Sequence, residues 1–283
     1  LKARPAANLF LLRYLRKFKA RTVGGNVILH SHLPPLNSRA YSRFVDEHLL
    51  KKIPGPSHAQ VGLTNACPQR CEYCYNRERE GVPMDAEKIR ETISRLKAMG
   101  VFWIGLTGGE PLLQPEIVSI VEEATPDCAV KLFTTGCGLK PGLAEALKSA
   151  GMFSVSVSLD HWTAVVHDRV RSYPGAFRTA LAAVETFKAA GLHVGVSAVL
   201  SREMIRAGET KTLLAFLRGL DIDEAWISEA KPSGRAFWKP DCVITDEERN
   251  ALIALQDREN AKGGMTVNYL GHFESAAHFG CNA

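Results

Sequence analysis

The main part of the chain repeats one pattern of apolar and polar positions: an amphipathic helical stretch, a turn that contains glycine, and a short β-rich run. In residues 85–100, the side chains of Ile89, Ile93 and Leu96 recur at helical spacing, so we expect them to form one buried face. The aspartate that opens this stretch and the glycine that closes it are typical helix caps. A β-rich run at 101–106 follows directly. The pattern therefore predicts a helix followed by a strand.

Six such strands are expected along the chain. They lie at 59–64, 101–106, 128–135, 152–159, 192–200 and 224–230, and helical stretches follow them at 85–100, 115–124, 140–151, 174–191, 211–220 and 245–260. Strands and helices that alternate at this spacing imply an α/β protein with a parallel sheet and right-handed crossovers. A partial (β/α)6 barrel and a doubly wound sheet both satisfy the pattern, and periodicity alone does not choose between them.

Composition narrows the class of protein only slightly. The 283 residues are 46% hydrophobic and 23% charged, which is ordinary for a soluble protein and enough for one large barrel or two domains. No run of about 18 apolar residues occurs, so no membrane-spanning helix is expected. The seven cysteines form a poor disulfide framework, because their number is odd and three are clustered. We therefore expect a reducing, cytoplasmic compartment.

Charge is distributed unevenly along the chain. Residues 1–55 carry eleven Lys and Arg against only Asp46 and Glu47, a net +9, which leaves −4 on the rest of a chain whose total is +5. Within this basic N-terminal extension, residues 8–21 have the pattern of an amphipathic helix. Such a helix is compatible with an anionic membrane surface, and so with peripheral membrane association, or with an acidic partner. The alternative is a helix docked on the protein's own body with its charges in water.

Three cysteines follow the first expected strand at the spacing C-x3-C-x2-C: Cys67, Cys71 and Cys74. A loop of this length can wrap three thiolates around an iron–sulfur cluster. A zinc site needs a fourth Cys or His with its own regular spacing, and His58 lies on the far side of the strand, where we expect a surface residue. A thioredoxin-like CxxC motif would leave Cys67 without a role. Three ligands on a four-iron cluster leave one iron open to a substrate or cofactor.

A second motif, LTGGEPLL, lies at the end of the second expected strand. Gly108 and Gly109 allow a ligand to approach the backbone closely, Glu110 offers a carboxylate to a cation, and Pro111 follows. In a barrel, chemistry gathers at the carboxyl ends of the strands. Because both motifs lie at such ends, they favour the barrel over the doubly wound sheet.

The two motifs resemble those of the radical S-adenosylmethionine (SAM) enzymes, in which an aromatic residue, here Tyr73, precedes the last cysteine. The resemblance covers roughly residues 59–245 and implies a partial (β/α)6 TIM-type barrel, which we place at 56–262. It implies a 4Fe-4S cluster on the three cysteines, with SAM as the second cofactor and its amino group on the GGEP motif. It also implies reductive cleavage of SAM to a 5′-deoxyadenosyl radical that abstracts hydrogen, with an electron donor of the flavodoxin or ferredoxin type.

Other strand ends supply further candidates for the site. Thr134 reaches the same edge of the sheet, and the resemblance suggests Ser158 and Arg171 as partners of the ribose and carboxylate of SAM, with the backbone of Val199 beside the adenine. Asp160, His161 and Trp162 are candidates for substrate contact, the first two as catalytic residues, although a histidine after a strand is more often a satisfied surface or core residue. Glu229 is either buried or functional, depending on the face it occupies.

The phrases SLD at 158–160 and HDRVR at 167–171 are typical of the branch of the family that modifies peptides and proteins. We therefore expect a peptide or protein side chain as substrate, and no nucleic-acid partner. One rival is the same chemistry on a lipid or another membrane-associated small molecule, which the basic extension suggests. Another is an iron–sulfur electron carrier or sensor that binds no SAM, for which the GGEP motif has no use.

Residues 263–283 resemble the start of a SPASM or twitch domain, a C-terminal region that holds an auxiliary iron–sulfur cluster. The phrase GCNA places Cys281 as the first ligand of such a cluster; alternatively Cys281 is an unpaired cysteine. The chain opens without a methionine and stops inside this phrase, so we expect it to be truncated. Cys128, Cys137 and Cys242 are isolated in the sequence and are interpreted as small buried hydrophobic residues.

Overall fold

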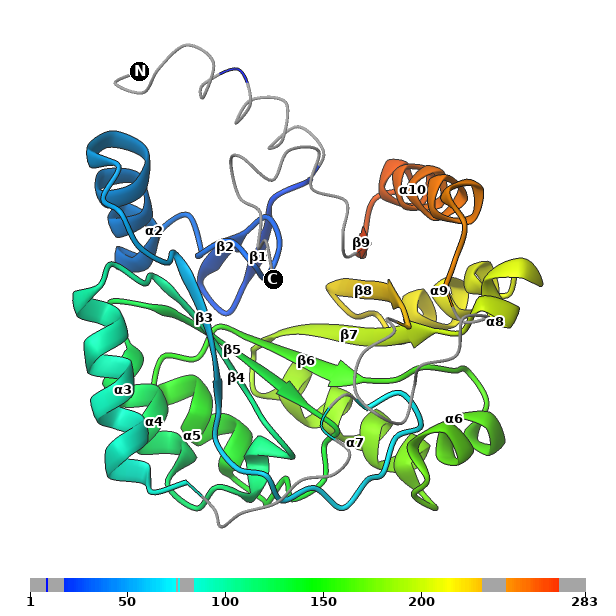
Figure 1. The fold of residues 1–283 in the computed structure, drawn as a ribbon, viewed down its shortest axis with the longest axis horizontal. Helices are drawn as coiled ribbons and strands as arrows, with labels where there is room; N and C mark the ends of the chain where they lie inside the picture. The colour runs from blue at the N-terminus through cyan, green and yellow to red at the C-terminus, as the bar shows by residue number, and fades with distance from the viewer. Residues whose placement is uncertain (1–8, 10–17, 75, 77–83, 231–242, 270–283) are drawn as a thin grey trace.

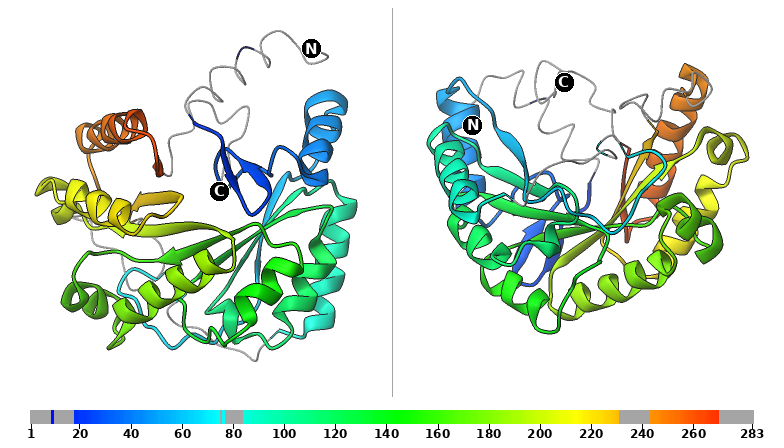
Figure 2. Two further views of the ribbon diagram at one scale, coloured as in Figure 1. Left: turned by 180° about the vertical axis from the view of Figure 1, so that it is seen from behind. Right: turned by 60° about the horizontal axis from the view of Figure 1, so that its bottom comes forward.

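The computed structural model describes residues 9, 18–74, 76, 84–230 and 243–269. Its centre is a seven-stranded parallel sheet in the order β3-β4-β5-β6-β7-β8-β9, so every strand pairs with the one before it (Figure 1). The sheet curves into an open arc with helices along its outer side (Figure 2). A doubly wound sheet would reverse its strand order partway across. The α/β partial barrel is therefore confirmed.

All six expected strands are present, and a seventh follows them. They are β3 (His58–Gly62), β4 (Trp103–Thr107), β5 (Ala129–Thr134), β6 (Ser154–Ser158), β7 (His193–Leu200), β8 (Glu224–Glu229) and β9 (Thr266–Tyr269). The six expected helices are α3 (Ala86–Ala98), α4 (Ile117–Ala124), α5 (Leu143–Ser149), α7 (Ala176–Ala189), α9 (Thr210–Gly219) and α10 (Asp246–Ala261). Within the described barrel, after β3, three further short helices were not expected: η2 (Pro111–Leu113), α6 (Ala164–Arg171) and α8 (Arg202–Arg206).

Helix α3 shows how the local sequence sets an element. Asp85 caps its start by accepting a hydrogen bond from the backbone N–H of Glu87 at 2.9 Å. Gly100 follows its end with a φ of 95°, a left-handed conformation that favours glycine. Ile89 and Ile93 are fully buried against the sheet. Burial of each isoleucine contributes about 1.5–3 kcal/mol of hydrophobic free energy. The buried face and the two caps predicted from the sequence are therefore confirmed.

The two faces of the sheet pack against different partners. One face joins the surrounding helices in the main core, to which β5 contributes Val130 and Leu132. The alternate residues of the same strand point to the other face, because side chains alternate along a strand. There Ala129 and Phe133 pack with Trp103 in a second, smaller core. This second core lines the inside of the arc.

Residues of the N-terminal extension close the amino-terminal end of the arc. A hairpin of β1 (Arg21–Val23) and β2 (Asn26–Ile28) leads through residues 29–33 to α2 (Arg39–Arg43) and the π-helical segment η1 (Phe44–Lys51). Ser31 is fully buried: its carbonyl accepts from Trp103 Nε1 at 2.8 Å, and its hydroxyl accepts from Lys131 Nζ at 2.5 Å.

The described part of the extension is therefore docked on the protein's own body. Most of the expected helix at 8–21 lies outside the described residues, but at Arg21–Val23 the chain forms a strand instead. His58 was expected at the surface, and this expectation is wrong. Its ring is half-buried among Phe102 and Trp103, and its Nε2 lies 2.9 Å from the carbonyl oxygen of His32. Within the described residues, no helix is long and apolar enough to cross a membrane.

The sheet continues past the expected barrel boundary at residue 262. Strand β9 pairs with β8 in parallel register, with Thr266 opposite Glu224, and it packs on α10. Its four residues are all buried, and it is the seventh strand of the sheet. The rest of the expected SPASM or twitch-like region, 270–283 with Cys281, lies outside the described residues. The domain boundaries stay a prediction.

Candidate active site

The cysteine loop follows β3 and is fastened to the end of α6. The backbone N–H of Arg70 donates to the carbonyl of Arg171 at 3.1 Å, and that of Glu72 donates to the carbonyl of Val170 at 3.0 Å. These bonds join segments about a hundred residues apart in the sequence. Cys71 lies between them and is buried, with 7% of its surface exposed. The loop is thus held against α6 before any ligand is considered.

The three cysteines of this loop share one neighbourhood. The pKa of the Cys71 thiol is raised, first by burial, and further by the nearby Asp160 carboxylate and by the Cys74 and Cys67 thiols, while the Arg171 guanidinium opposes the rise. No disulfide joins the five described cysteines.

The spacing of these thiols suits a cluster better than a single ion. Among the described residues, no three Cys, His, Asp or Glu side chains are close enough together to hold one metal ion. The thiolates around an iron–sulfur cluster bind different iron atoms, so they stand further apart than the ligands of one ion. Three neighbouring thiols in one loop therefore fit an iron–sulfur cluster.

The loop after β4 presses directly against the cysteine loop. The backbone N–H of Gly109 donates to the carbonyl of Thr64 at 2.5 Å, and that of Glu110 donates to the carbonyl of Ala66 at 2.7 Å. A Cβ atom at Gly109 would stand 2.1 Å from the Ala66 carbonyl oxygen, and one at Gly108 would stand 2.5 Å from that of Thr64. We expected these glycines to allow a ligand to approach closely. In the structure they instead allow the backbone of the neighbouring loop to approach.

Glu110 is fully buried, and both of its carboxylate oxygens accept hydrogen bonds. The donors are the hydroxyl of Thr134 at 2.6 Å, the hydroxyl and N–H of Thr135 at 2.5 and 2.7 Å, and the N–H of Leu112 at 3.1 Å. Burial raises the pKa of Glu110, and these hydrogen bonds oppose the rise. An ammonium group can reach this carboxylate only if it displaces or shares one of the donors.

A second polar cluster centres on Asp160, directly after β6. Its Oδ2 accepts from the Tyr73 hydroxyl and from Arg171 Nε, both at 2.8 Å, and its Oδ1 accepts from the backbone N–H of Val199 at 2.9 Å. The other end of the Arg171 guanidinium reaches the thiol of Cys71, with 3.7 Å between Nη1 and Sγ. Burial alone would lower the pKa of Arg171, but the Asp160 carboxylate outweighs it and the pKa is raised.

Among the described residues, and apart from the three cysteines and Ser158, the predicted site residues thus fall into two groups and one outlier. Glu110 lies in the loop of residues 108–111 and accepts from Thr134, while Tyr73, Arg171 and Val199 surround Asp160. The outlier is His161, whose half-buried ring stacks on Trp162 with 3.9 Å between ring centroids and whose Nδ1 accepts from the backbone N–H of Thr163 at 3.0 Å. Ser158 is half-buried at the carboxyl end of β6. Glu229 is buried and paired with Arg249 at 3.0 Å.

The sequence interpretation missed Cys137, which is not isolated in the structure. Gln69 donates from its side-chain nitrogen to the Cys137 sulfur at 3.7 Å, and its oxygen accepts from the Cys71 thiol at 3.9 Å. Cys137 follows β5, so the strand-end rule that located Glu110 would have placed it at the same edge of the sheet. Cys128 does match its interpretation: it is buried, and burial raises its pKa to about 12. Cys242 lies outside the described residues.

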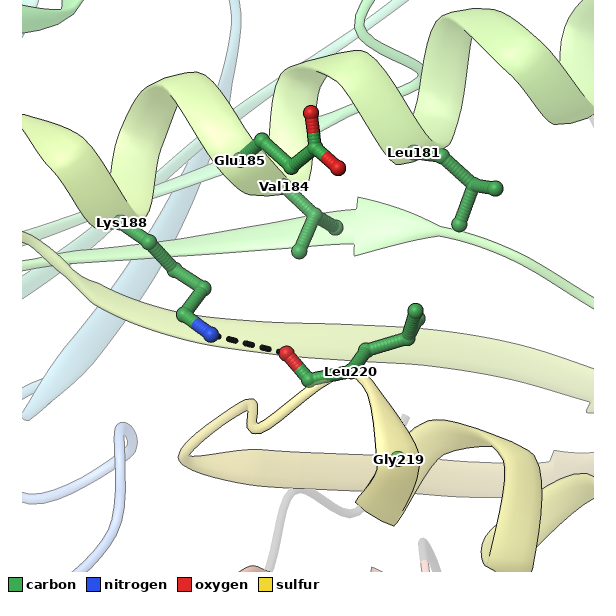
Figure 3. Close-up of a pocket in the computed structure, with 6 residues that line it drawn as sticks. All are labelled: Leu181, Val184, Glu185, Lys188, Gly219 and Leu220. Carbon is green, nitrogen blue, oxygen red and sulfur yellow. Dashed lines mark hydrogen bonds between the residues drawn. The ribbon is translucent and has the colours of Figure 1, made fainter.

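A cavity of about 370 Å³ lies elsewhere, between α7 and α9 on the outer side of the arc (Figure 3). Its lining residues are Leu181, Val184, Glu185, Lys188, Gly219 and Leu220. Lys188 donates to the carbonyl of Leu220 at 2.8 Å, which ties the two helices together. None of the predicted site residues lines this cavity, and we assign the chemistry to the carboxyl ends of the strands instead.

Comparison with known proteins decides the family. The sequence model of the Radical SAM superfamily matches residues 61–212, which is more than half of the 283 residues. The chain belongs to the radical SAM superfamily. The match runs from the end of β3 to the first part of α9 and includes the cysteine loop, the GGEP loop and the Asp160 cluster.

Two curated relatives of this radical SAM chain are named as a peptide cyclase and as a maturase. One is the PqqA peptide cyclase of Ruegeria pomeroyi, 31% identical over 157 residues that make up 53% of this chain and 41% of the relative. The other is the mycofactocin maturase MftC of Mycobacterium ulcerans, 32% identical over 177 residues, or 61% of this chain and 47% of the relative. The chain spans about half the length of the curated relatives it matches.

The fold is also that of a protein solved with bound S-adenosylmethionine. SuiB of Streptococcus suis, solved with bound S-adenosylmethionine, superposes with a TM-score of 0.67 over 82% of this chain and 54% of SuiB, at 14% identity. The same protein has been solved bound to its precursor peptide SuiA. At this identity the similarity shows the shared fold.

Proposed function

We propose that this radical SAM chain forms the barrel of an enzyme that matures a peptide or protein. In this proposal Cys67, Cys71 and Cys74 would hold a 4Fe-4S cluster, and with only three protein ligands the cluster would be open to SAM. The observation that carries the proposal is the convergence of three interacting thiols and the Glu110 loop at the carboxyl ends of neighbouring parallel strands. Active sites of barrel enzymes lie at this end of the sheet.

The substrate class is inferred from the names of similar proteins. One relative is called a peptide cyclase, another a mycofactocin maturase, and SuiB has been solved with a precursor peptide. The SLD and HDRVR phrases at 158–160 and 167–171 support the same branch. A peptide or protein side chain is therefore the preferred substrate.

In this mechanism the bound cluster and SAM supply one-electron chemistry that removes a hydrogen atom from a substrate carbon. The chain's own residues bind and orient these groups. Glu110 offers its carboxylate to the ammonium of the methionine half, and the hydroxyls of Thr134 and Thr135 can rotate to share it. Ser158 and Val199, in the neighbouring strands β6 and β7, are assigned to the ribose and adenine. Orientation and the exclusion of water by the buried walls direct the reaction to one C–H bond.

His161 is the residue that we assign to the substrate. It lies at the mouth of the arc beside the end of β6, half-buried and stacked on Trp162. Its pKa is lowered, first by burial, which favours the neutral imidazole. Because Nδ1 accepts from the N–H of Thr163, the proton of the neutral ring lies on Nε2, which can donate one hydrogen bond to a substrate. Asp160 is assigned a positioning role, since its oxygens already accept three hydrogen bonds.

The cluster assignment predicts which cysteines are required for iron binding. After anaerobic reconstitution, the wild type is expected to bind one 4Fe-4S cluster, and Cys71→Ala is expected to lose it. Cys128→Ala is the matched control, because Cys128 is also buried but contacts the carbonyl of Val101 instead of the loop. Iron and sulfide analysis with EPR spectroscopy measures both. Equal loss in the two variants, or a cluster that survives Cys71→Ala, would contradict the assignment.

The substrate is tested separately, by deuterium tracing into 5′-deoxyadenosine. Candidate peptides deuterated at single side chains are incubated with the reconstituted, reduced enzyme. Transfer of deuterium from a peptide supports the proposal, whereas transfer only from a lipid would favour the rival substrate class.

The proposal also includes an electron donor and a second cluster. We infer an electron donor of the flavodoxin or ferredoxin type, because the chemistry requires one electron at low potential. We also assign Cys281 to an auxiliary cluster, which additional iron in a longer form of the chain would support. Peripheral membrane contact in the cytoplasm is kept as the alternative role of the basic extension, whose described residues pack on the barrel. Vesicle flotation with and without residues 1–25 tests this contact.

A further inference from the structure

Cys71 is the most buried of the three loop cysteines, and a fixed positive group meets its sulfur. Nη1 of Arg171 lies 3.7 Å from Cys71 Sγ, within the range of an N–H···S hydrogen bond. Both residues are almost inaccessible to solvent, with 7% of Cys71 and 5% of Arg171 exposed. Water therefore screens this contact very little.

Arg171 is held in this position from several sides. Its Nε forms an ion pair with Asp160 Oδ2 at 2.8 Å, and the exposed fractions of the two side chains are only 6% and 3%. Its guanidinium carbon lies 5.5 Å from the centre of the Tyr73 ring, and its own carbonyl accepts the N–H of Arg70. The planar fork of arginine can join two partners at fixed angles, which a lysine ammonium does not do.

The order in which Asp160, Arg171 and Cys71 contact one another decides whether the ion pair raises or lowers the reduction potential of a cluster bound to Cys71. The guanidinium bonds the Asp160 carboxylate through Nε and the thiol through Nη1. The sulfur therefore meets the positive end of the ion pair, although the pair as a whole is close to neutral. Hydrogen bonds to ligand sulfurs and local charge are among the factors that set the potential of an iron–sulfur cluster. A donor on the thiolate stabilises the more negative, reduced state, which raises the reduction potential.

We propose that Arg171, positioned by Asp160, donates a hydrogen bond to the Cys71 thiolate and raises the reduction potential of the cluster that this thiolate holds. The inference rests on the proposed function for the presence of that cluster. It gives Arg171 a role different from the SAM contact expected from the sequence. Asp160 also binds the N–H of Val199, so one carboxylate connects the cysteine loop to β7.

The test compares Arg171→Gln and Arg171→Lys with Arg169→Gln. Arg169 lies on the same helix and carries the same charge, but it is exposed, which makes it the matched control. All are reconstituted anaerobically and titrated without SAM, with EPR spectroscopy as the measure of the reduced cluster. Arg171→Gln is expected to make reduction about tenfold less favourable, which is a potential about 59 mV lower for a one-electron couple. Arg171→Lys is expected to fall between, and Arg169→Gln to match the wild type.

Resonance Raman spectroscopy separates the hydrogen bond from a general charge effect. In the wild type an iron–thiolate stretching band should shift in D₂O, and Arg171→Gln should abolish that shift. Unchanged potentials and bands with weaker SAM binding would overturn the inference and return Arg171 to SAM. If Arg171→Gln assembles no cluster, the same potentials and bands are compared between Arg171→Lys and the wild type. Lysine keeps the positive charge but lacks the planar guanidinium that joins Asp160 to Cys71. A wild type without a cluster would instead defeat the proposed function.

Discussion

At the scale of single residues, the Glu110 carboxylate has the most demanding surroundings. It is fully buried, and two of its donors are backbone N–H groups, of Thr135 and Leu112, which cannot rotate away. Leaving a buried donor unpaired costs about 1–3 kcal/mol. The motif that suggested a cofactor contact therefore also holds the ends of β4 and β5 together.

Glu110→Gln is expected to lower the free energy of unfolding of the cluster-free protein by about 1–3 kcal/mol, because the amide nitrogen would face N–H donors. Glu116→Gln is the control: Glu116 pairs with Arg90 at the surface, where an ion pair is worth about 0–1 kcal/mol. Denaturant unfolding measures both. Equal, small changes would show that the Glu110 hydrogen bonds are not needed for stability.

At the scale of elements, the site depends on two loops whose backbones touch. The loops after β3 and β4 approach so closely that Gly109 has no room for a side chain, although its φ is not in the left-handed region. The requirement for glycine is therefore steric. The end of α6 fastens the other side of the cysteine loop through Arg70 and Glu72.

Gly109→Ala is expected to push the two loops apart and to prevent cluster assembly, because its Cβ would stand 2.1 Å from the carbonyl oxygen of Ala66. Gly219→Ala is the control: Gly219 lies in helix α9 with no atom near the added Cβ, so alanine should be neutral or stabilise the helix by up to about 1 kcal/mol. Iron content and thermal unfolding measure the pair. A full cluster in Gly109→Ala would contradict the steric account.

At the scale of the whole molecule, the amino-terminal end of the arc is closed by a polar network. Ser31 bridges Lys131 and Glu224, and buried histidines, among them His30 and His193, surround them. Burial, reinforced by the nearby Lys131 charge, lowers the pKa of both histidines from 6.5 to about 3. The fold thus requires neutral histidines at the end opposite the site.

This network predicts acid sensitivity. Between pH 6.5 and about 3, the unfolded chain binds protons on His30 and His193 that the folded protein does not, so the free energy of unfolding falls as the pH is lowered. This contribution is fully present above pH 6.5. His193→Gln removes one of these groups and should flatten the decline, as denaturant unfolding at a series of pH values would measure. An equally steep decline in this variant would contradict the role of His193.

The sequence by itself determined the architecture and the reactive thiols. Alternating strand and helix patterns specify a parallel sheet because periodicity is a local property, and the caps of α3 follow from neighbouring residues. The cysteine spacing and the GGEP motif are local as well, and their strand-end positions chose the barrel. Each of these features depends on residues close together in the chain.

Only the tertiary structure decided which distant side chains meet. The Arg171–Cys71 contact joins residues 100 positions apart, and Gln69 reaches Cys137 across 68. The docking of Ser31 and the addition of β9 to the sheet likewise depend on surfaces that exist only after the strands have paired. Such contacts are set by side-chain rotamers and by the approach of whole loops, and a linear pattern does not encode them.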